Sequence, residues 1–325
     1  MSRPLIHRKP GRLALPPTFL FLAGAFAAAW LLVSLFGRGQ FLSAANITNI
    51  FIRSVALGIV AVGQSFTILG GSIDLSVAHL ISVTAVMSSF IMQGDSANIA
   101  RAVAVVVAIG LGVGLLNGLI ITKLRVNALI ATLGTGLFMQ GLLSTSFQNF
   151  AGAVAPEFEV FAYGTWGPVP IPVAVLLVVA ALGVLVMHRT RFGAYLYAVG
   201  GNREVARLSG LRTDRVLIGA HVIASLSAVL TGLFIAARLG AGAPWVGQDG
   251  VYDLESIAAV VVGGTALAGG RGGVLGTLAG VLIFSIMDAM FNQLGTGAFL
   301  KQVFRGLIII AAVASYSFRS KEEVS

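Results

Sequence analysis

The residues from 13 to 37 read LALPPTFLFLAGAFAAAWLLVSLFG and contain no Asp, Glu, Lys or Arg. A helix needs about 20 mostly apolar residues to cross the hydrocarbon core of a membrane, so this stretch predicts a transmembrane helix. Four basic residues stand just before it, at Arg3, Arg8, Lys9 and Arg12. A cleavable signal peptide is the alternative, because Ala27 to Ala29 are small, but its apolar region spans only about 7–15 residues. We therefore expect the segment to remain as a first membrane span.

The composition of the whole chain agrees with a membrane protein. Of its 325 residues 57% are hydrophobic and 10% are charged, whereas soluble domains average about 45–50% apolar and about 25% charged residues. The formal net charge is +9, but the basic residues form short clusters between apolar runs, which argues against nucleic-acid binding. There is no cysteine, and the four histidines form no HxxH or HExxH pair. We therefore expect no metal site and no catalytic residues.

Charge-free runs recur along the chain and predict an all-α integral membrane protein. We expect about ten transmembrane helices, at residues 18–36, 49–70, 75–93, 100–122, 127–147, 170–187, 215–238, 254–269, 273–292 and 298–316. They form one transmembrane domain, residues 18–316, with a basic tail at 1–17 and a second tail at 317–325. Within this single domain we expect a cytoplasmic loop at 188–214.

The basic residues predict the orientation of these helices. An even number of spans puts both termini on one side, and cytoplasmic loops carry an excess of Lys and Arg. A cytoplasmic location of the termini places inside the N-terminal cluster, Lys123, Arg125, the arginines from Arg189 to Arg215, Arg271, Arg319 and Lys321. The opposite loops carry one basic residue, Arg38, and five acidic residues, Asp95, Glu157, Glu159, Asp249 and Asp253. Trp166 and Trp245 are expected as interfacial anchors on that side.

Two Gly-rich segments break the helical pattern, LGGSIDLS at 69–76 and VGGTALAGGRGG at 262–273. Both contain a Gly pair followed by Ser or Thr, which hints at two related halves. Irregular backbone at membrane depth is tolerated where protein shields it or where it lines a wet cavity. The candidate pathway or broken-helix residues are therefore Gly70, Gly71, Ser72, Asp74, Ser76, Asn117, Gly263, Gly264 and Thr265. Asp74 is interpreted either as a helix cap or as a substrate contact.

Other polar residues inside the predicted spans have structural interpretations. Asp288 and Arg305 lie on the last two spans, where an ion pair would lower the cost of burial. Glu255 suits the first turn of a helix as a solvated acid. The uncharged polar residues either hydrogen-bond between helices or line a path, and they are Gln64, Thr67, Asn117, Asn127, Gln140, Ser144 and Asn292.

The loop at 188–214 contains a short helix pattern of its own. Asn202 can cap a helix with Glu204 in its first turn, and Gly210 supplies a left-handed stop. Val205, Leu208 and Leu211 would share an apolar face. An amphipathic helix surrounded by arginine suits either docking to a partner or contact with anionic lipid.

Three segments together resemble one family, the ribose, xylose and arabinose-type permeases of bacterial ATP-binding cassette importers. They are GGSIDLSV at 70–77, AVGGNREVARLSG at 198–210 and DLESIAAVVVGGTALAGGRGGVLGTLAG at 253–280. The middle segment is similar to the importer signature of Glu, two alanines, three residues and Gly, with Val205 in place of the first alanine. Ala78 stands where the family usually has Gly.

The resemblance implies that the loop couples transport to an ATPase. It assigns this contact to Gly201, Asn202, Glu204, Val205, Ala206, Leu208 and Gly210. It further implies a cytoplasmic ATPase with two nucleotide-binding domains, a periplasmic or extracellular sugar-binding protein, and a second permease copy, identical or different. ATP and magnesium would be bound by the ATPase, since this chain has no GxxxxGK[ST] motif.

We therefore expect a permease subunit of the bacterial inner membrane that imports a ribose-like pentose or other small sugar and performs no bond chemistry. An ion-coupled secondary transporter is the alternative, and Asp74 and Asp288 are its cue. A membrane-embedded transferase is a third possibility, but paired acids and clustered histidines are absent from the sequence.

The orientation can be tested by single-cysteine labelling, because the chain has no cysteine of its own. We predict that cysteines at positions 11, 125, 202 and 322 react only from the cytoplasmic side, and that those at 157 and 248 react from outside. Labelling of position 202 from outside would contradict the orientation.

Overall fold

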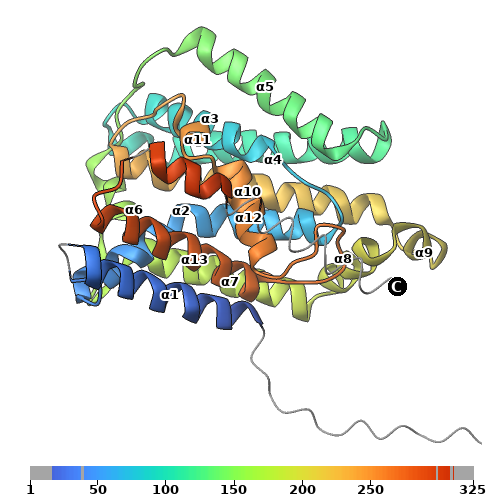
Figure 1. Cartoon of the computed structure of the whole chain (residues 1–325). Helices are drawn as coiled ribbons and strands as arrows, with labels where there is room; N and C mark the ends of the chain where they lie inside the picture. The colour runs from blue at the N-terminus through green and yellow to red at the C-terminus, as the bar shows by residue number, and fades with distance from the viewer. Residues whose placement is uncertain (1–16, 38–39, 298, 308–309, 311–325) are drawn as a thin grey trace, which may run out of the picture.

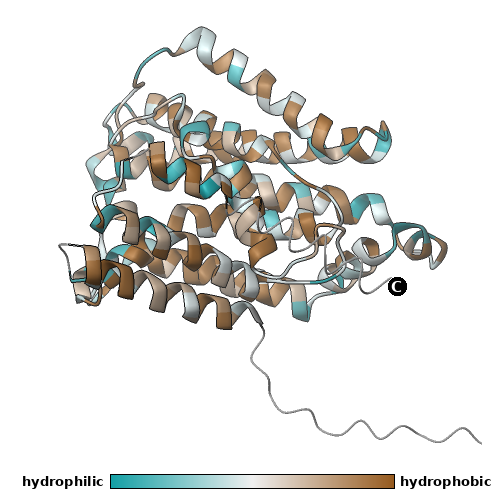
Figure 2. Cartoon of the chain, viewed as in Figure 1, coloured by the Kyte–Doolittle hydropathy of each residue, from teal (hydrophilic) through white to brown (hydrophobic). Residues whose placement is uncertain are grey.

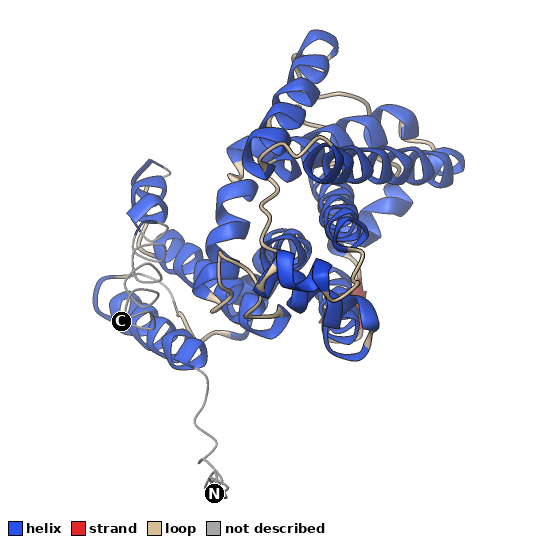
Figure 3. Ribbon diagram, turned by 90° about the vertical axis from the view of Figure 1, so that its right-hand side faces the viewer, coloured by secondary structure: helices blue, strands red, loops and turns tan. Residues whose placement is uncertain are grey.

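The structure is a computed structural model that describes residues 17–37, 40–297, 299–307 and 310, and most of them are helical (Figure 3). The α-helices are α1 Pro17–Phe36, α2 Ala44–Leu69, α3 Ser76–Met92, α4 Ile99–Lys123, α5 Ala128–Ser146, α6 Val160–Tyr163, α7 Ile171–Arg189, α8 Arg191–Gly201, α9 Arg203–Leu208, α10 Thr213–Leu239, α11 Val246–Asp249, α12 Tyr252–Val262 and α13 Val274–Gln293. Residues 299–307 are also helical. Two 3₁₀ turns, η1 Ser96–Asn98 and η2 Pro156–Glu159, complete the helical elements.

A two-residue hairpin is the one strand pair among the described residues. Strands β1 Thr165–Trp166 and β2 Val169–Pro170 pair antiparallel, with Trp166 opposite Val169. Gly167 has φ +61° and makes the tight turn between them. The predicted anchor Trp166 lies on this hairpin and is 82% exposed.

Seven described helices are long and apolar enough to cross a membrane, namely α1, α2, α4, α5, α7, α10 and α13. Their ends agree with the predicted spans within a few residues, except that α2 begins at Ala44 rather than at residue 49. Helix α3 is apolar but has only 17 residues. The all-helical membrane class is confirmed, whereas the number of ten spans stays a prediction. The tails predicted at 1–17 and 317–325 lie almost entirely outside the described residues.

The span predicted at 254–269 is wrong in its extent. Helix α12 has 11 residues and ends at Val262, because Gly263 caps it and Gly264 turns the backbone to φ +90°. At about 1.5 Å per residue it covers only about half of a hydrocarbon core. The apolar run continues beyond Val262 as a loop, so hydropathy alone does not locate the helix end.

The helices run side by side, with α2 and α10 in the interior of the bundle and with α1 and α5 at opposite edges (Figure 1). Hydrophobic residues cover the helices along their length, and hydrophilic ones gather mainly at the helix ends and in loops (Figure 2). The main core joins α2, α3, α10, α12 and α13, with Ile59, Leu80, Val260 and Phe234 fully or almost fully buried.

A row of glycines lets α4 approach α10 closely. Gly110, Gly114 and Gly118 follow one another at four-residue intervals, and each faces the α10 backbone or a side chain on it. A Cβ added at Gly114 would lie 2.6 Å from Val222 Cα and 2.9 Å from the His221 carbonyl oxygen. Small residues at such a spacing are the usual device for close helix contact inside membranes.

Replacing Gly114 by Ala should therefore lower the free energy of unfolding by about 1–3 kcal/mol, since the two backbones must separate. Gly112→Ala is the matched control in the same helix, because no atom lies within 4 Å of a Cβ there. It should stabilise the helix by about 0.5–1 kcal/mol. Thermal unfolding of the purified variants measures both, and equal midpoints would contradict the close α4–α10 contact.

Candidate functional site

The loop between α7 and α10 forms two short helices that extend from one end of the bundle, at the right of Figure 1. Helix α8 was not predicted from the sequence. It begins where Thr190 Oγ1 accepts a hydrogen bond from the Gly193 amide at 3.2 Å. Helix α9 follows after Asn202, whose Oδ1 accepts from the Val205 amide at 3.0 Å. The predicted cap at Asn202 is confirmed.

The end of α9 also forms as predicted. Gly210 has φ +84°, its amide donates to the Arg207 carbonyl at 3.0 Å, and the Leu211 amide donates to the Ala206 carbonyl at 3.1 Å. These two bonds, with a left-handed glycine, make a Schellman stop. The geometry explains why glycine stands at position 210.

Helix α9 presents part of its apolar face outward. Val205 and Leu208 are 57% and 77% exposed, whereas Ala206 on the other side is 4% exposed and packs against the bundle. Leu211 is only partly exposed and packs inward. A short surface helix with exposed valine and leucine suits docking to another protein.

Asp214, which the sequence analysis did not single out, ties α9 to the bundle. Its carboxylate accepts from Lys123 Nζ at 2.7 Å and from Arg203 Nη2 at 3.2 Å. These contacts join the end of α4, the start of α9 and the start of α10. Asp214 is one of only two acids in the basic loop, which is the signal that could have identified it.

Three glycine segments meet where α8 ends. The Gly270 amide donates to the Leu69 carbonyl at 2.9 Å. A Cβ on Gly200 would lie 1.8 Å from the same carbonyl oxygen, and one on Gly269 would lie 2.9 Å from the Gly200 carbonyl oxygen. We call this contact of residues 69–71, 200–201 and 269–270 the glycine junction. It brings the two predicted breaks together and places the loop helix α8 between them.

The first break also contains a buried polar network. Asp74 Oδ1 accepts from the Ser76 amide at 2.9 Å, and Asp74 Oδ2 lies 2.9 Å from His221 Nδ1. His221 Nε2 lies 2.9 Å from Ser72 Oγ, and Asn117 Nδ2 donates to Ser76 Oγ at 2.9 Å. Asp74, Ser76, Asn117 and His221 are 0% exposed. Asp74 accepts from the first amide of α3, although Leu75 holds the N-cap position. Its partner His221 was missed by the sequence analysis.

The second break is equally packed. Thr265 is 1% exposed, and its Oγ1 accepts from the Gly273 amide at 3.2 Å. A Cβ on Gly263 would lie 2.4 Å from the Gly276 carbonyl oxygen, so α12 and α13 touch backbone to backbone. In the first break, Gly70 caps α2 and Gly71 has φ +75°. Whether any of these residues contacts substrate stays a prediction.

The predicted ion pair between Asp288 and Arg305 is confirmed, and a second carboxylate joins it. Arg305 Nη2 lies 2.8 and 2.7 Å from the two Asp288 carboxylate oxygens, and Arg305 Nε lies 3.0 Å from Glu255 Oε1. Glu255 is only 6% exposed. The interpretation of Glu255 as a solvated acid is therefore wrong. Arg305 compensates the burial of its carboxylate.

Comparison with known proteins identifies the family of this chain. Residues 46–313 match the family described as branched-chain amino acid transport system / permease component. The chain belongs to this permease family. The match spans α2 through residue 307, including the glycine junction, α9 and both breaks.

Curated relatives cover nearly the whole permease. It is 37% identical over 297 residues to the ribose import permease protein RbsC of Bacillus subtilis, which covers 89% of this chain and 91% of that protein. It is 36% identical to RbsC of Escherichia coli, over 84% of this chain and 86% of that protein. The L-arabinose transport system permease protein AraH of E. coli is 35% identical, over 81% of this chain and 80% of that protein. No solved structure matches. The permease is a multi-pass protein of the bacterial inner membrane.

Replacing Gly200 by Ala should disturb the glycine junction, because the new Cβ would overlap the Leu69 carbonyl oxygen. We expect a loss of about 1–3 kcal/mol in the free energy of unfolding, together with a loss of transport. Gly201→Ala is the control, since a Cβ there has no atom within 4 Å. Melting temperature and uptake measure the effect, and a Gly200→Ala variant that behaves like Gly201→Ala would exclude a tight junction.

Proposed function

We propose that this permease is the membrane-spanning subunit of an ATP-driven importer for a monosaccharide such as ribose or arabinose. The observation that carries the proposal is the match along nearly the whole chain to ribose import permeases of two distant bacteria. The arabinose permease AraH supports the broader class of small sugars. The choice among these sugars is made in such systems largely by a separate binding protein.

In this proposal the chain has ten spans with both termini in the cytoplasm, and two copies enclose the path. A cytoplasmic ATPase with two nucleotide-binding domains holds ATP and magnesium, and a binding protein delivers the sugar from outside. The permease itself needs no cofactor. Its arginine-rich end, which carries α8 and α9, would face the ATPase, as the distribution of basic residues favours.

The physical basis for coupling is the position of α9. Its ends are fixed by the Asn202 cap and the Gly210 stop, and Asp214 ties its first residue to α4 and α10. When a partner displaces the exposed side chains of Val205 and Leu208, α9 therefore moves as a rigid body and displaces the ends of the helices to which it is tied. Helix α8 carries this displacement to the glycine junction, where both broken segments can respond.

The ion-coupled alternative depended on free carboxylates at membrane depth. Asp74 bonds to His221 and Ser76, and Asp288 bonds to Arg305. Both carboxylates are therefore already bonded to partners within the fold, and this supports the ATP-driven importer over the ion-coupled transporter.

Reconstitution tests the proposal. Liposomes that contain the permease, its ATPase and its binding protein should take up ribose or a related sugar only when ATP is supplied, and the isolated permease should hydrolyse no ATP. Uptake driven by a proton or sodium gradient without the ATPase would instead support a secondary transporter. Hydrolysis by the isolated chain would overturn the assignment.

Substitutions in α9 test the coupling contact. Glu204→Lys reverses a charge in the first turn, which costs about 0.3–1 kcal/mol for the helix dipole alone. Gly210→Val places a β-branched residue at φ +84°, which costs about 1–2 kcal/mol or more. Both variants should insert at normal abundance but lose ATPase association and uptake. Glu157→Lys, at the opposite end of the bundle, is the control, and normal co-purification of both α9 variants would refute the contact.

A further inference from the structure

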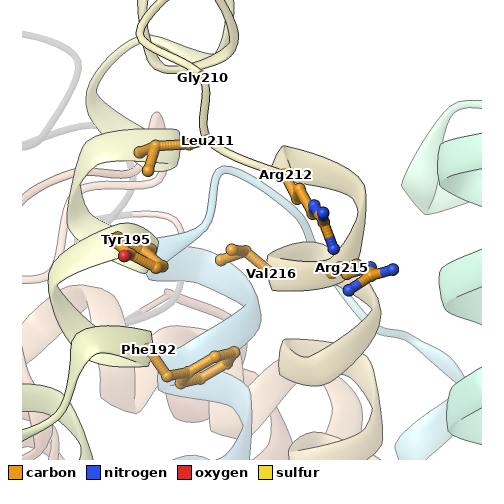
Figure 4. Close-up of a pocket in the computed structure, with 7 residues that line it drawn as sticks. All are labelled: Phe192, Tyr195, Gly210, Leu211, Arg212, Arg215 and Val216. Atoms are coloured by element: carbon orange, nitrogen blue, oxygen red, sulfur yellow. The ribbon is translucent and has the colours of Figure 1, made fainter.

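A cavity of about 420 Å³ lies between α8 and the start of α10, next to the stop of α9. Phe192 and Tyr195 of α8 form one wall (Figure 4). Val216 points toward them from the other wall, and the guanidinium groups of Arg212 and Arg215 lie on the α10 side, turned away from α8. The cavity thus combines an apolar and aromatic interior with a cationic rim.

Among the residues that the structure describes, neither rim arginine forms an ion pair with an acid. Asp214 stands between them in the sequence, but its carboxylate is already bonded to Lys123 and Arg203. Glu204, the other acid of the loop, lies 3.5 Å from Arg207. Within the described residues no carboxylate lies within 4.0 Å of the guanidinium groups of Arg212 and Arg215. Within that part of the chain, the rim therefore carries two positive charges without an acidic partner.

The depth of the cavity fits a lipid. Helix α7 ends at Arg189 and α10 begins at Thr213, and both are long enough to cross the membrane. The cavity lies at their common end, which is the level of the headgroups when both helices cross a bilayer. Basic pockets between helices at this depth suit the phosphate of an anionic lipid, and an adjacent apolar wall suits its glycerol and the first part of its acyl chains.

We propose that this cavity binds one anionic phospholipid, with its phosphate at Arg212 and Arg215 and its apolar part against Phe192, Tyr195 and Val216. Gly210 and Leu211 also line the cavity. The lipid would therefore contact the stop that fixes the end of α9, and its presence would hold the docking helix in place. This is a lipid requirement for coupling, in addition to the proposed transport function.

An acidic segment of the ATPase would be the alternative ligand for the two rim arginines. The exposed side chains of α9, Val205 and Leu208, do not line the cavity, whose interior walls come from the bundle-side helices α8 and α10. The apolar wall at headgroup depth favours a lipid.

The test uses the full-length permease in nanodiscs that contain equal amounts of phosphatidylglycerol and phosphatidylcholine, followed by native mass spectrometry of the retained lipids. The variant is Arg212→Gln with Arg215→Gln. The matched control is Arg189→Gln with Arg191→Gln, which removes two exposed arginines at the same end but outside the cavity. The wild type and the control should retain one phosphatidylglycerol, and the variant should bind it about 20- to 30-fold more weakly.

A second measurement needs no substitution. A photoactivatable phosphatidylglycerol added to the wild-type permease should form adducts at residues 192–195 and 211–216, whereas soluble glycerol phosphate in excess should not displace it. Equal lipid loss in the variant and the control, or adducts spread around the bundle, would overturn the proposal. Displacement by soluble glycerol phosphate would assign the cavity to a free phosphate ester. Displacement by the purified ATPase would assign it to that protein.

Discussion

The hydrogen bond from the Gly270 amide to the Leu69 carbonyl holds together the two segments in which the membrane helices are broken. It can form because Gly200, which has no side chain, lies directly against the same carbonyl oxygen. Any larger residue at position 200 would push the three backbones apart. The end of α2, the loop before α13 and the end of α8 are therefore in direct backbone contact. Helix α9 is attached to the end of α8 by the single residue Asn202.

The surrounding interactions keep this junction in place. The buried carboxylate of Asp74 compensates its loss of water with His221 and Ser76, and Asn117 extends the network to α4. Helix α4 in turn packs along α10 through its glycine row. Because a buried charge without its partner costs several kcal/mol, these contacts hold the first break in one geometry. The first break can then respond as one unit when the loop end moves.

The sequence was informative where a local rule decides the structure. Charge-free runs located the long helices, and the residue types at Asn202 and Gly210 located both ends of α9. The use of charge-free runs to locate helix ends failed at α12, because the apolar run continues past Val262 although Gly264 turns the chain. Long-range contacts could not be predicted from the sequence, because they result from tertiary packing. Examples are the contact of His221 with Asp74, the contact of Glu255 with Arg305 and the meeting of the three glycine segments. Helix α8 was missed because its apolar residues face the bundle in a loop rich in arginine.

The central claim is that motion of α9 reaches both broken segments through the glycine junction. Hydrogen exchange of the permease bound to its ATPase in nanodiscs, with and without a non-hydrolysable ATP analogue, tests it most directly. The account predicts that the analogue changes amide exchange together in residues 66–76, 196–210 and 262–274, while α5 at the edge of the bundle serves as an internal reference. A change confined to residues 203–210, with unaltered exchange in 66–76 and 262–274, would contradict it.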